Sequence, residues 1–185
     1  FTTYRPGHAD YAGSIKYNHE DLRNILERSS ARKTAIEVAV GAVAKQILKE
    51  FDIKGHSNIL RIGNGRTEEE FKQEIDQAKE AGDTVGGKIE VIYENLPVGL
   101  GSFVQWDRKI DGKIAQAVMS IPAVKSVAVG NHHAYKMKGS EFHDEMYAKD
   151  GKIYRKTNNA GGVEGGMTNG ENLVVTAGVR TNLTQ

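Results

Sequence analysis

The fold is decided by residues 31–62, which read ARKTAIEVAVGAVAKQILKEFDIKGHSNILRI. Apolar residues recur over 31–51 at spacings of 4, 3, 4 and 4, which is typical of one face of an α-helix. These residues are Ile36, Val40, Val43, Ile47 and Phe51. Residues 38–44 are nearly all small or apolar, so we expect the helix to be covered on most sides, with a close neighbouring backbone at Gly41. Residues 59–62 predict a strand after the helix.

Helices and strands alternate along the rest of the chain. The remaining predicted elements are a short helix from Asn18 as N-cap to Glu27, a surface helix from the capping box Thr67-x-x-Glu70 to Gly82, a half-buried strand over 88–94, an amphipathic helix over 107–120 stopped by Pro122, a strand over 124–129, a type I′ hairpin at Asp150-Gly151 and a last strand over 172–179. This mixture predicts an α+β or a layered α/β fold, and the length suggests one domain or two small ones.

Composition excludes several classes of protein. The chain has 25 Lys and Arg against 24 Asp and Glu, so the basic excess of a dedicated nucleic-acid binder is missing. The absence of cysteine excludes disulfides, thiolate metal sites and a cysteine nucleophile. No apolar run reaches the length of a membrane span, and the start shows no signal-peptide pattern. The chain begins at Phe1 and stops without a helix closure or tail, so we treat it as an internal piece of a longer protein.

The first candidate binding element is RSSAR, residues 28–32, at the start of the long predicted helix. Its two serines lie where the free N–H groups of a helix start point outward, and its two arginines can each clamp a phosphate or carboxylate. These residue types favour an anionic ligand. The alternative is that the serines only cap the helix, while the arginines pair with Glu27 or Glu37.

The second candidate is the glycine-rich segment 158–170, NNAGGVEGGMTNG. Five of the ten residues from Gly161 to Gly170 are glycine. Such a run lets a ligand or another backbone approach closely, and successive N–H groups can bind anions. The segment matches neither a Walker loop nor a dinucleotide-binding fingerprint. A purely structural turn is the alternative.

The third candidate is His8. Residues 1–17 have turn character, and the sequence RPGH over residues 5–8 places His8 on a tight corner, because proline fixes φ and glycine is permissive. A lone histidine is more often a surface or core residue than a functional one. His132 and His133 are adjacent and have no third ligand at a zinc spacing, so we predict no metal site.

Several of these motifs, in this order, resemble chorismate synthase, and the resemblance covers nearly all of the chain. They are RPGHAD (5–10), ERSSAR (27–32) with its helix, LPVGLGSFVQWDRK (96–109), IPAVK (121–125), GSE (139–141) and the glycine-rich segment up to Gly170. The resemblance implies a layered α+β fold, a β-α-β sandwich with helices between antiparallel sheets. It also implies that residues 1–185 form part of a single domain that is incomplete at both ends.

The resemblance also implies an activity. Members of that family eliminate phosphate from 5-enolpyruvylshikimate 3-phosphate to give chorismate, and they require reduced FMN although no net redox change occurs. NADPH enters only indirectly or in bifunctional members. A homotetramer in the cytoplasm is implied, with no nucleic-acid or membrane partner. The competing hypotheses are an inactive flavin-binding remnant of the family and, without the resemblance, a module that binds phosphate ligands.

Carried over by motif, the resemblance assigns roles to particular residues. His8 is the expected acid–base histidine. Substrate anions are expected at Arg5, Ala31 and Arg32. FMN contacts are expected at Arg28, Ser29, Ser30, Pro122, Ala123, Gly165, Arg180, Thr181, Asn182, Leu183 and Thr184.

The chain also departs from the family pattern. Residues 180–184 read RTNLT where relatives usually carry a Lys-Pro pair, and Pro122 stands where many relatives have Asn or Gln. The family's first section with a second catalytic histidine, its last section with an Arg and a catalytic Asp, and a longer loop near residues 63–67 are expected to be absent from these residues.

Overall fold

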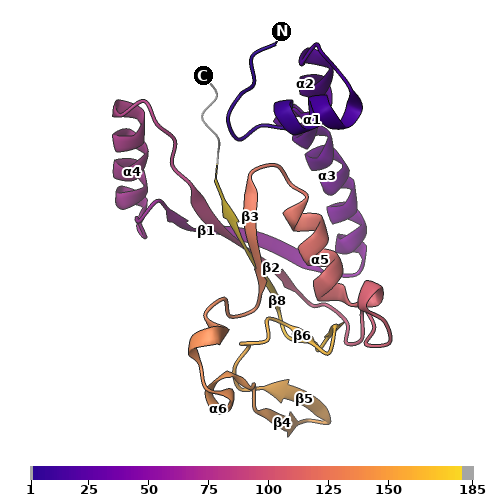
Figure 1. The fold of residues 1–185 in the computed structure, drawn as a ribbon. Coiled ribbons are helices and arrows are strands. Elements are labelled where there is room, and N and C mark those ends of the chain that lie inside the picture. The colour runs from indigo at the N-terminus through magenta and orange to yellow at the C-terminus, as the bar shows by residue number, and fades with distance from the viewer. Residues whose placement is uncertain (1, 181–185) are drawn as a thin grey trace.

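A four-stranded antiparallel sheet forms the centre of the computed structural model, which describes residues 2–180 (Figure 1). The order of its strands is β1-β2-β8-β3. Their bounds are β1 Lys54–Ile62, β2 Gly87–Glu94, β8 Leu173–Val179 and β3 Val124–Val129. The architecture is a mixed α+β one, which confirms the predicted fold class.

Helices connect and flank this sheet. The chain starts with α1 (Asp10–Tyr17), α2 (Arg23–Ser29), the 3₁₀ turn η1 (Ala31–Lys33) and α3 (Thr34–Glu50). Strands β1 and β2 are joined by α4 (Glu68–Glu80). Between β2 and β3 lie η2 (Trp106–Arg108) and α5 (Ile110–Met119). The segment before β8 holds η3 (Ala134–Lys136), α6 (Gly139–Phe142) and the hairpins β4 (Met146–Lys149)–β5 (Lys152–Arg155) and β6 (Val163–Glu164)–β7 (Met167–Thr168). Figure 1 shows α1 and α2 at one end of the molecule and the two hairpins at the other.

The core lies between α5 and one face of the sheet. Leu173 and Val175 of β8 are each 7% exposed, and alternation along the strand places both on the same face. Val163 joins them in the buried cluster. The apolar stripe of α5 packs on this cluster through Ile110, Ile114 and Val118. Burial of this stripe explains why the predicted amphipathic helix forms here.

Most local predictions for the sheet region are confirmed. The helix predicted over 107–120 forms as α5, which is shorter, because the 3₁₀ turn η2 replaces its start. Strand β3 spans the strand predicted over 124–129. Both halves of the Thr67–Glu70 capping box form at the start of α4. Asp150 and Gly151 adopt φ values of 51° and 73°, as a type I′ hairpin requires. The first strand is longer than predicted, because β1 begins at Lys54 and pairs with β2 along its whole length.

The prediction for residues 1–27 is wrong in two respects. Residues 10–17 form helix α1 rather than turns, and Asn18 ends that helix instead of starting the next. Asn18 adopts a left-handed φ of 53°, and its N–H bonds to the carbonyl of Ser14. Asparagine tolerates this conformation, so the residue that resembles an N-cap serves as a C-cap.

The expectation that helix 31–51 is covered on most sides is also wrong within residues 2–180. Helix α3 forms, but Ile36 and Phe51 are each 71% exposed and Val40 is 65% exposed. Within the described residues, its main contacts are with η1 at its start and with β1. No atom of the described residues lies within 4 Å of a Cβ placed at Gly41, so the close backbone predicted there is not found among them.

Candidate functional site

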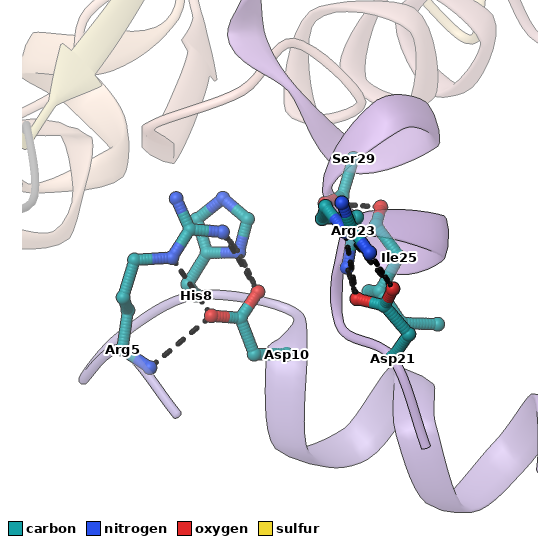
Figure 2. A network of polar contacts seen from close by, with 7 residues as sticks. All are labelled: Arg5, His8, Asp10, Asp21, Arg23, Ile25 and Ser29. Carbon is teal, nitrogen blue, oxygen red and sulfur yellow. Dashed lines mark hydrogen bonds and ion pairs between the residues drawn. The ribbon is translucent and has the colours of Figure 1, made fainter. Parts of the chain in front are cut away.

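The corner at residues 5–10 holds a compact polar cluster (Figure 2). Gly7 has a φ of 70°, and the N–H of His8 bonds to the carbonyl of Arg5 at 3.3 Å. The Arg5 guanidinium donates to Asp10 through Nε and Nη2, each at 2.8 Å. His8 Nδ1 lies 2.7 Å from Asp10 Oδ1 and 3.0 Å from Arg5 Nη2. The corner therefore joins two residues predicted for the site, His8 and Arg5, through a third.

Asp10 is the centre of this cluster. Its side chain has no exposed surface, whereas those of Arg5 and His8 are 22% and 20% exposed. The side-chain hydrogen bonds from Arg5 hold the pKa of the Asp10 carboxyl well below its usual range, against the opposing effect of burial. The carboxyl is thus an anion at neutral pH. The same bonds raise the pKa of Arg5.

Segment 28–32 comprises the end of α2 and the first residues of η1, just before α3. Ser29 ends α2 and donates its hydroxyl to the carbonyl of Ile25 at 2.8 Å. Ser30 caps η1, accepting from the N–H of Arg32 at 3.3 Å. Ser30 therefore has a capping role, at η1 rather than at the start of α3.

The pairing alternative for the two arginines is not supported. Lys33 takes Glu37 as its partner, with Nζ and Oε1 3.6 Å apart. Among residues 2–180, no ion pair joins Arg28 or Arg32 to a carboxylate. Ala31 lies between them in η1 and is exposed.

A cavity of about 480 Å³ lies between α1 and α2. Its lining includes Arg28 and Ser29, two of the residues predicted to contact a cofactor, together with His19 and Asn24. Apolar parts of Ala9, Gly13, Tyr17 and Ile25 complete it. A volume of this size lies within the range of cofactor sites.

A third group of predicted residues meets where α5 leads into β3. The N–H of Arg180 donates to the carbonyl of Ala123 at 2.9 Å, which brings the end of β8 against the residue that follows Pro122. Ala123 has a φ of 70°, a left-handed conformation that is strained for alanine. The Arg180 guanidinium donates to the carbonyl of Thr84 at 2.8 Å. Residues 181–184, which were also predicted to contact FMN, lie outside the described residues.

Two of the five glycines in the glycine-rich segment, Gly161 and Gly162, pack against other backbone. A Cβ at Gly161 would lie 2.3 Å from Gly130 Cα, and one at Gly162 would lie 2.6 Å from the carbonyl of Asn172. The structural alternative therefore accounts for these positions. Gly165 differs, because no described atom lies within 4 Å of a Cβ placed there.

Gly165 faces its own cavity of about 460 Å³, which is also lined by Asp111, His143, Asp144 and Glu164. Figure 1 places β6, which ends beside Gly165, at the other end of the sheet from α2. Within this chain, Gly165 and the Arg28–Ser29 cavity therefore do not share one site.

Two anchoring carboxylates were missed by the reading of the sequence. Asp10 stands two residues after His8, a spacing that on a turn can bring a carboxylate to a ring nitrogen, so a local signal existed. Asp144 accepts from the N–H groups of Asn159 and Ala160 at 2.8 and 2.9 Å. No sequence pattern marks these partners, because they lie 15 and 16 residues away.

Among residues 2–180, no three His, Asp or Glu side chains lie close enough together to hold a metal ion. The rings of His132 and His133 have their centroids 4.1 Å apart and are tilted by 53° to each other. Burial, Lys88 and His133 lower the pKa of His132. None of the helices in the described part of the chain is both long and apolar enough to cross a membrane.

Comparisons with known proteins agree on one family. The family model for chorismate synthase matches residues 1–184. The chain is 56% identical over 181 residues to a chorismate synthase of Thermoanaerobacter pseudethanolicus, covering 97% of this chain and 52% of that protein. It is 48% identical over 214 residues to one of Geobacter sulfurreducens, covering 97% and 54%. A crystal structure of a chorismate synthase is similar with a TM-score of 0.89 at 45% identity, covering 93% of this chain and 62% of that one.

The chain spans about half the length of the curated relatives it matches. In both comparisons 97% of this chain is aligned, but the alignment is 181 residues long with the first relative and 214 residues long with the second. The relatives therefore differ in the length of the matching region. In the present structure, the N–H of Gly65 bonds to the carbonyl of Ile62 at 2.9 Å, which makes the connection from β1 to α4 a tight turn.

Proposed function

The chain belongs to the chorismate synthase family, and on that premise we propose that the protein of which it forms part converts 5-enolpyruvylshikimate 3-phosphate to chorismate. The reaction breaks one carbon–oxygen bond and one ring carbon–hydrogen bond, releases phosphate and a proton, and leaves a new ring double bond. The observation that carries the proposal is the corner at His8, where a partly exposed imidazole is held 2.7 Å from a fully buried carboxylate.

Reduced FMN is the proposed cofactor, and when bound it supplies transient electron density for the departure of phosphate. The fit rests on charge and space in segment 28–32. Arg28 and Ser29 line the cavity between α1 and α2, and Arg28 and Arg32 make no ion pair within the described residues. Cations of this kind suit the phosphate of a flavin nucleotide and the carboxylates of the substrate.

His8 is the proposed acid–base residue. Its Nδ1 is engaged by Asp10, so Nε2 is the nitrogen that can hold or release a proton toward a ligand. Arg5 is proposed to bind a substrate anion, although its Nε and Nη2 already donate to Asp10. Substrate binding by Arg5 would therefore use the remaining guanidinium nitrogen, Nη1.

The proposed FMN contacts at Ala123 and Arg180 are supported by their direct hydrogen bond and by the strained backbone of Ala123. Pro122 and residues 181–184 belong to the same proposal. Gly165 has open space beside it but lies at the far end of the sheet from α2. We infer that Gly165 contacts the FMN of a second copy of the chain, within the proposed homotetramer.

The proposal places the enzyme in the cytoplasm, where reduced nicotinamide such as NADPH would keep the flavin reduced, either through a separate reductase or through the protein itself. In this proposal the ligands are small anions, and the protein binds neither nucleic acid nor a membrane. The balanced charge of the chain supports that limit on partners.

Anaerobic turnover of 5-enolpyruvylshikimate 3-phosphate by the full-length protein tests the proposal. Chorismate and phosphate should form in equal amounts with reduced FMN, and neither should form with oxidised FMN. The competing hypothesis is an inactive remnant that still binds flavin. Flavin binding without product under reducing conditions would establish that alternative.

A further inference from the structure

The Asp10 carboxylate has four hydrogen-bonding contacts, all from residues within five positions of it. Oδ2 accepts from the N–H of Arg5 at 3.1 Å and from its Nε at 2.8 Å. Oδ1 accepts from Arg5 Nη2 at 2.8 Å and lies 2.7 Å from His8 Nδ1. All four contacts therefore lie within the corner of residues 5–10.

The 2.7 Å contact determines where the imidazole proton lies. An ionised carboxylate is only an acceptor, so this contact is favourable only when Nδ1 carries the proton. Arg5 Nη2, which donates one of its two hydrogens to Asp10 Oδ1, also lies 3.0 Å from Nδ1. If Nδ1 accepted from Nη2, however, its lone pair would stand 2.7 Å from the carboxylate oxygen, which is unfavourable. The form of the neutral ring that suits the 2.7 Å contact is therefore the Nδ1–H tautomer, with its lone pair on Nε2.

We propose that Asp10 is a positioning residue for His8, which fixes the Nδ1–H tautomer and leaves Nε2 as the nitrogen that transfers the proton. This inference rests on the proposed function, in which His8 exchanges a proton at the site. Figure 2 shows the second ring nitrogen of His8 on the side of the ring away from the Asp10 carboxylate. Asp10 itself touches neither substrate nor cofactor in this proposal, since its side chain is fully buried.

Arg5 has a defined part in this arrangement. Its two side-chain hydrogen bonds keep the Asp10 carboxyl ionised, which makes the carboxylate a lasting acceptor for His8 Nδ1–H. The chain also contains a matched pair without a histidine. Arg23 donates to Asp21 through its backbone N–H, Nε and Nη2, at 3.0, 2.9 and 2.6 Å (Figure 2).

Asp10→Asn should reverse the tautomer. The guanidinium of Arg5 requires an acceptor, so the single amide oxygen of the variant would turn toward Arg5. The amide NH₂ would then face His8 Nδ1, which would have to accept, and the ring proton would move to Nε2. Asp21→Asn removes the same kind of Arg–Asp pair from the neighbouring turn and leaves His8 untouched.

The test combines ¹⁵N NMR of the histidine rings with turnover by the full-length protein, at a pH well above about 6.5, the ordinary pKa of histidine. The unsubstituted protein should show the Nδ1–H signature at His8, Asp10→Asn the Nε2–H signature, and Asp21→Asn no change. We expect kcat to fall about 10- to 100-fold in Asp10→Asn with KM little changed, as for outer-shell partners of functional histidines.

An Nε2–H signature in the unsubstituted protein would overturn the inference without any variant, so the test holds even if Asp10→Asn does not fold. Full kcat in a folded Asp10→Asn protein would overturn it as well. If the unsubstituted protein forms no chorismate but shows the Nδ1–H signature, the proposed function fails while the assignment of the tautomer to Asp10 stands.

Discussion

The helical arm at the start of the chain, residues 2–51, and the sheet region, residues 54–180, are organised in opposite ways. In the arm, the apolar residues of α3 are exposed, with Ile36 at 71%. In the sheet region, residues far apart in sequence meet in a core where Val175 is 7% exposed. The arm carries most of the chemistry proposed here, and the sheet region carries most of the packing.

The carboxylates of Asp10 and Asp144 show the same contrast between local and long-range contacts. Asp10 is bound by side chains and backbone within five residues, and its cluster includes a titratable ring and a guanidinium near the surface. Asp144 binds the hydroxyl of Thr157 and the N–H groups of Asn159 and Ala160, all at least 13 residues away. A local carboxylate thus organises functional groups, whereas a long-range one holds a loop. The comparison predicts that the largest effects on activity come from substitutions in the arm and the largest effects on stability from substitutions in the sheet region.

The largest expected effect is on turnover and comes from the arm. His8→Ala should lower kcat about 10²- to 10⁴-fold, the usual contribution of a positioned acid–base group. The free energy of unfolding should change little, since the His8 side chain is partly exposed. Anaerobic steady-state kinetics of the full-length enzyme measure the effect. His56→Ala, at an exposed position of β1, is the control and should keep full activity; equal losses in both variants would contradict the prediction.

The largest effect on stability should come from the sheet region. In Gly130→Ala, the new Cβ would lie 2.3 Å from the carbonyl of Asn159 at a φ of 73°, so we expect a loss of about 3 kcal/mol from overpacking and backbone strain. Urea unfolding measures it. Gly41→Ala in the arm is the matched control and should gain up to about 1 kcal/mol, because it improves helix propensity in open space. A loss in the control would mean that a segment outside the described residues packs against Gly41.

The pH dependence of stability should separate Asp10 from an ordinary surface carboxylate. Because the folded-state pKa of Asp10 is lowered, its contribution is fully present above the ordinary aspartate pKa of about 3.9 and is lost as the pH falls through the folded value. The difference in unfolding free energy between the unsubstituted protein and Asp10→Asn should be about 2 kcal/mol at neutral pH and shrink below pH ~4. Unfolding curves at a series of pH values would refute this if the difference were constant.

A smaller loss is expected at Asp144. Burial raises the pKa of this carboxyl, but the hydrogen bonds from Thr157, Ala160 and Asn159 outweigh it, and the net pKa is lowered. Asp144→Asn replaces one acceptor oxygen by a donor and should cost about 1–2 kcal/mol. Asp150→Asn, at the exposed hairpin turn, should be neutral. Thermal unfolding compares the two, and equal midpoints would argue against an anchoring role.

The smallest effect is a gain at Ala123. Ala123→Gly relieves the left-handed strain at a φ of 70° and should stabilise the fold by up to about 1 kcal/mol. The same change frees the backbone at a proposed FMN contact, so affinity for FMN should weaken. Unfolding and flavin titration of one variant report both effects, and a loss of stability would show that the strain at Ala123 is compensated by its side chain.

The sequence by itself determined the elements whose causes are local. Four such elements formed as predicted, because each depends only on neighbouring residues. They are helix α3, the Thr67–Glu70 capping box, the Asp150-Gly151 turn and the corner at His8. Its motifs also determined the family, because several long patterns occur in one order along the whole chain. Asn18 shows the limit of such local patterns, since the same side chain suits either end of a helix.

Only the tertiary structure decided how distant residues meet. It brought Arg180 to Ala123, anchored the glycine-rich segment on Asp144 and Gly130, and placed Gly165 at the other end of the sheet from α2. It also left α3 uncovered within residues 2–180. Periodicity marks which face of a helix is apolar, but the partner that covers the face is set by the path of the whole chain. Contacts between residues tens of positions apart therefore leave no local pattern to read.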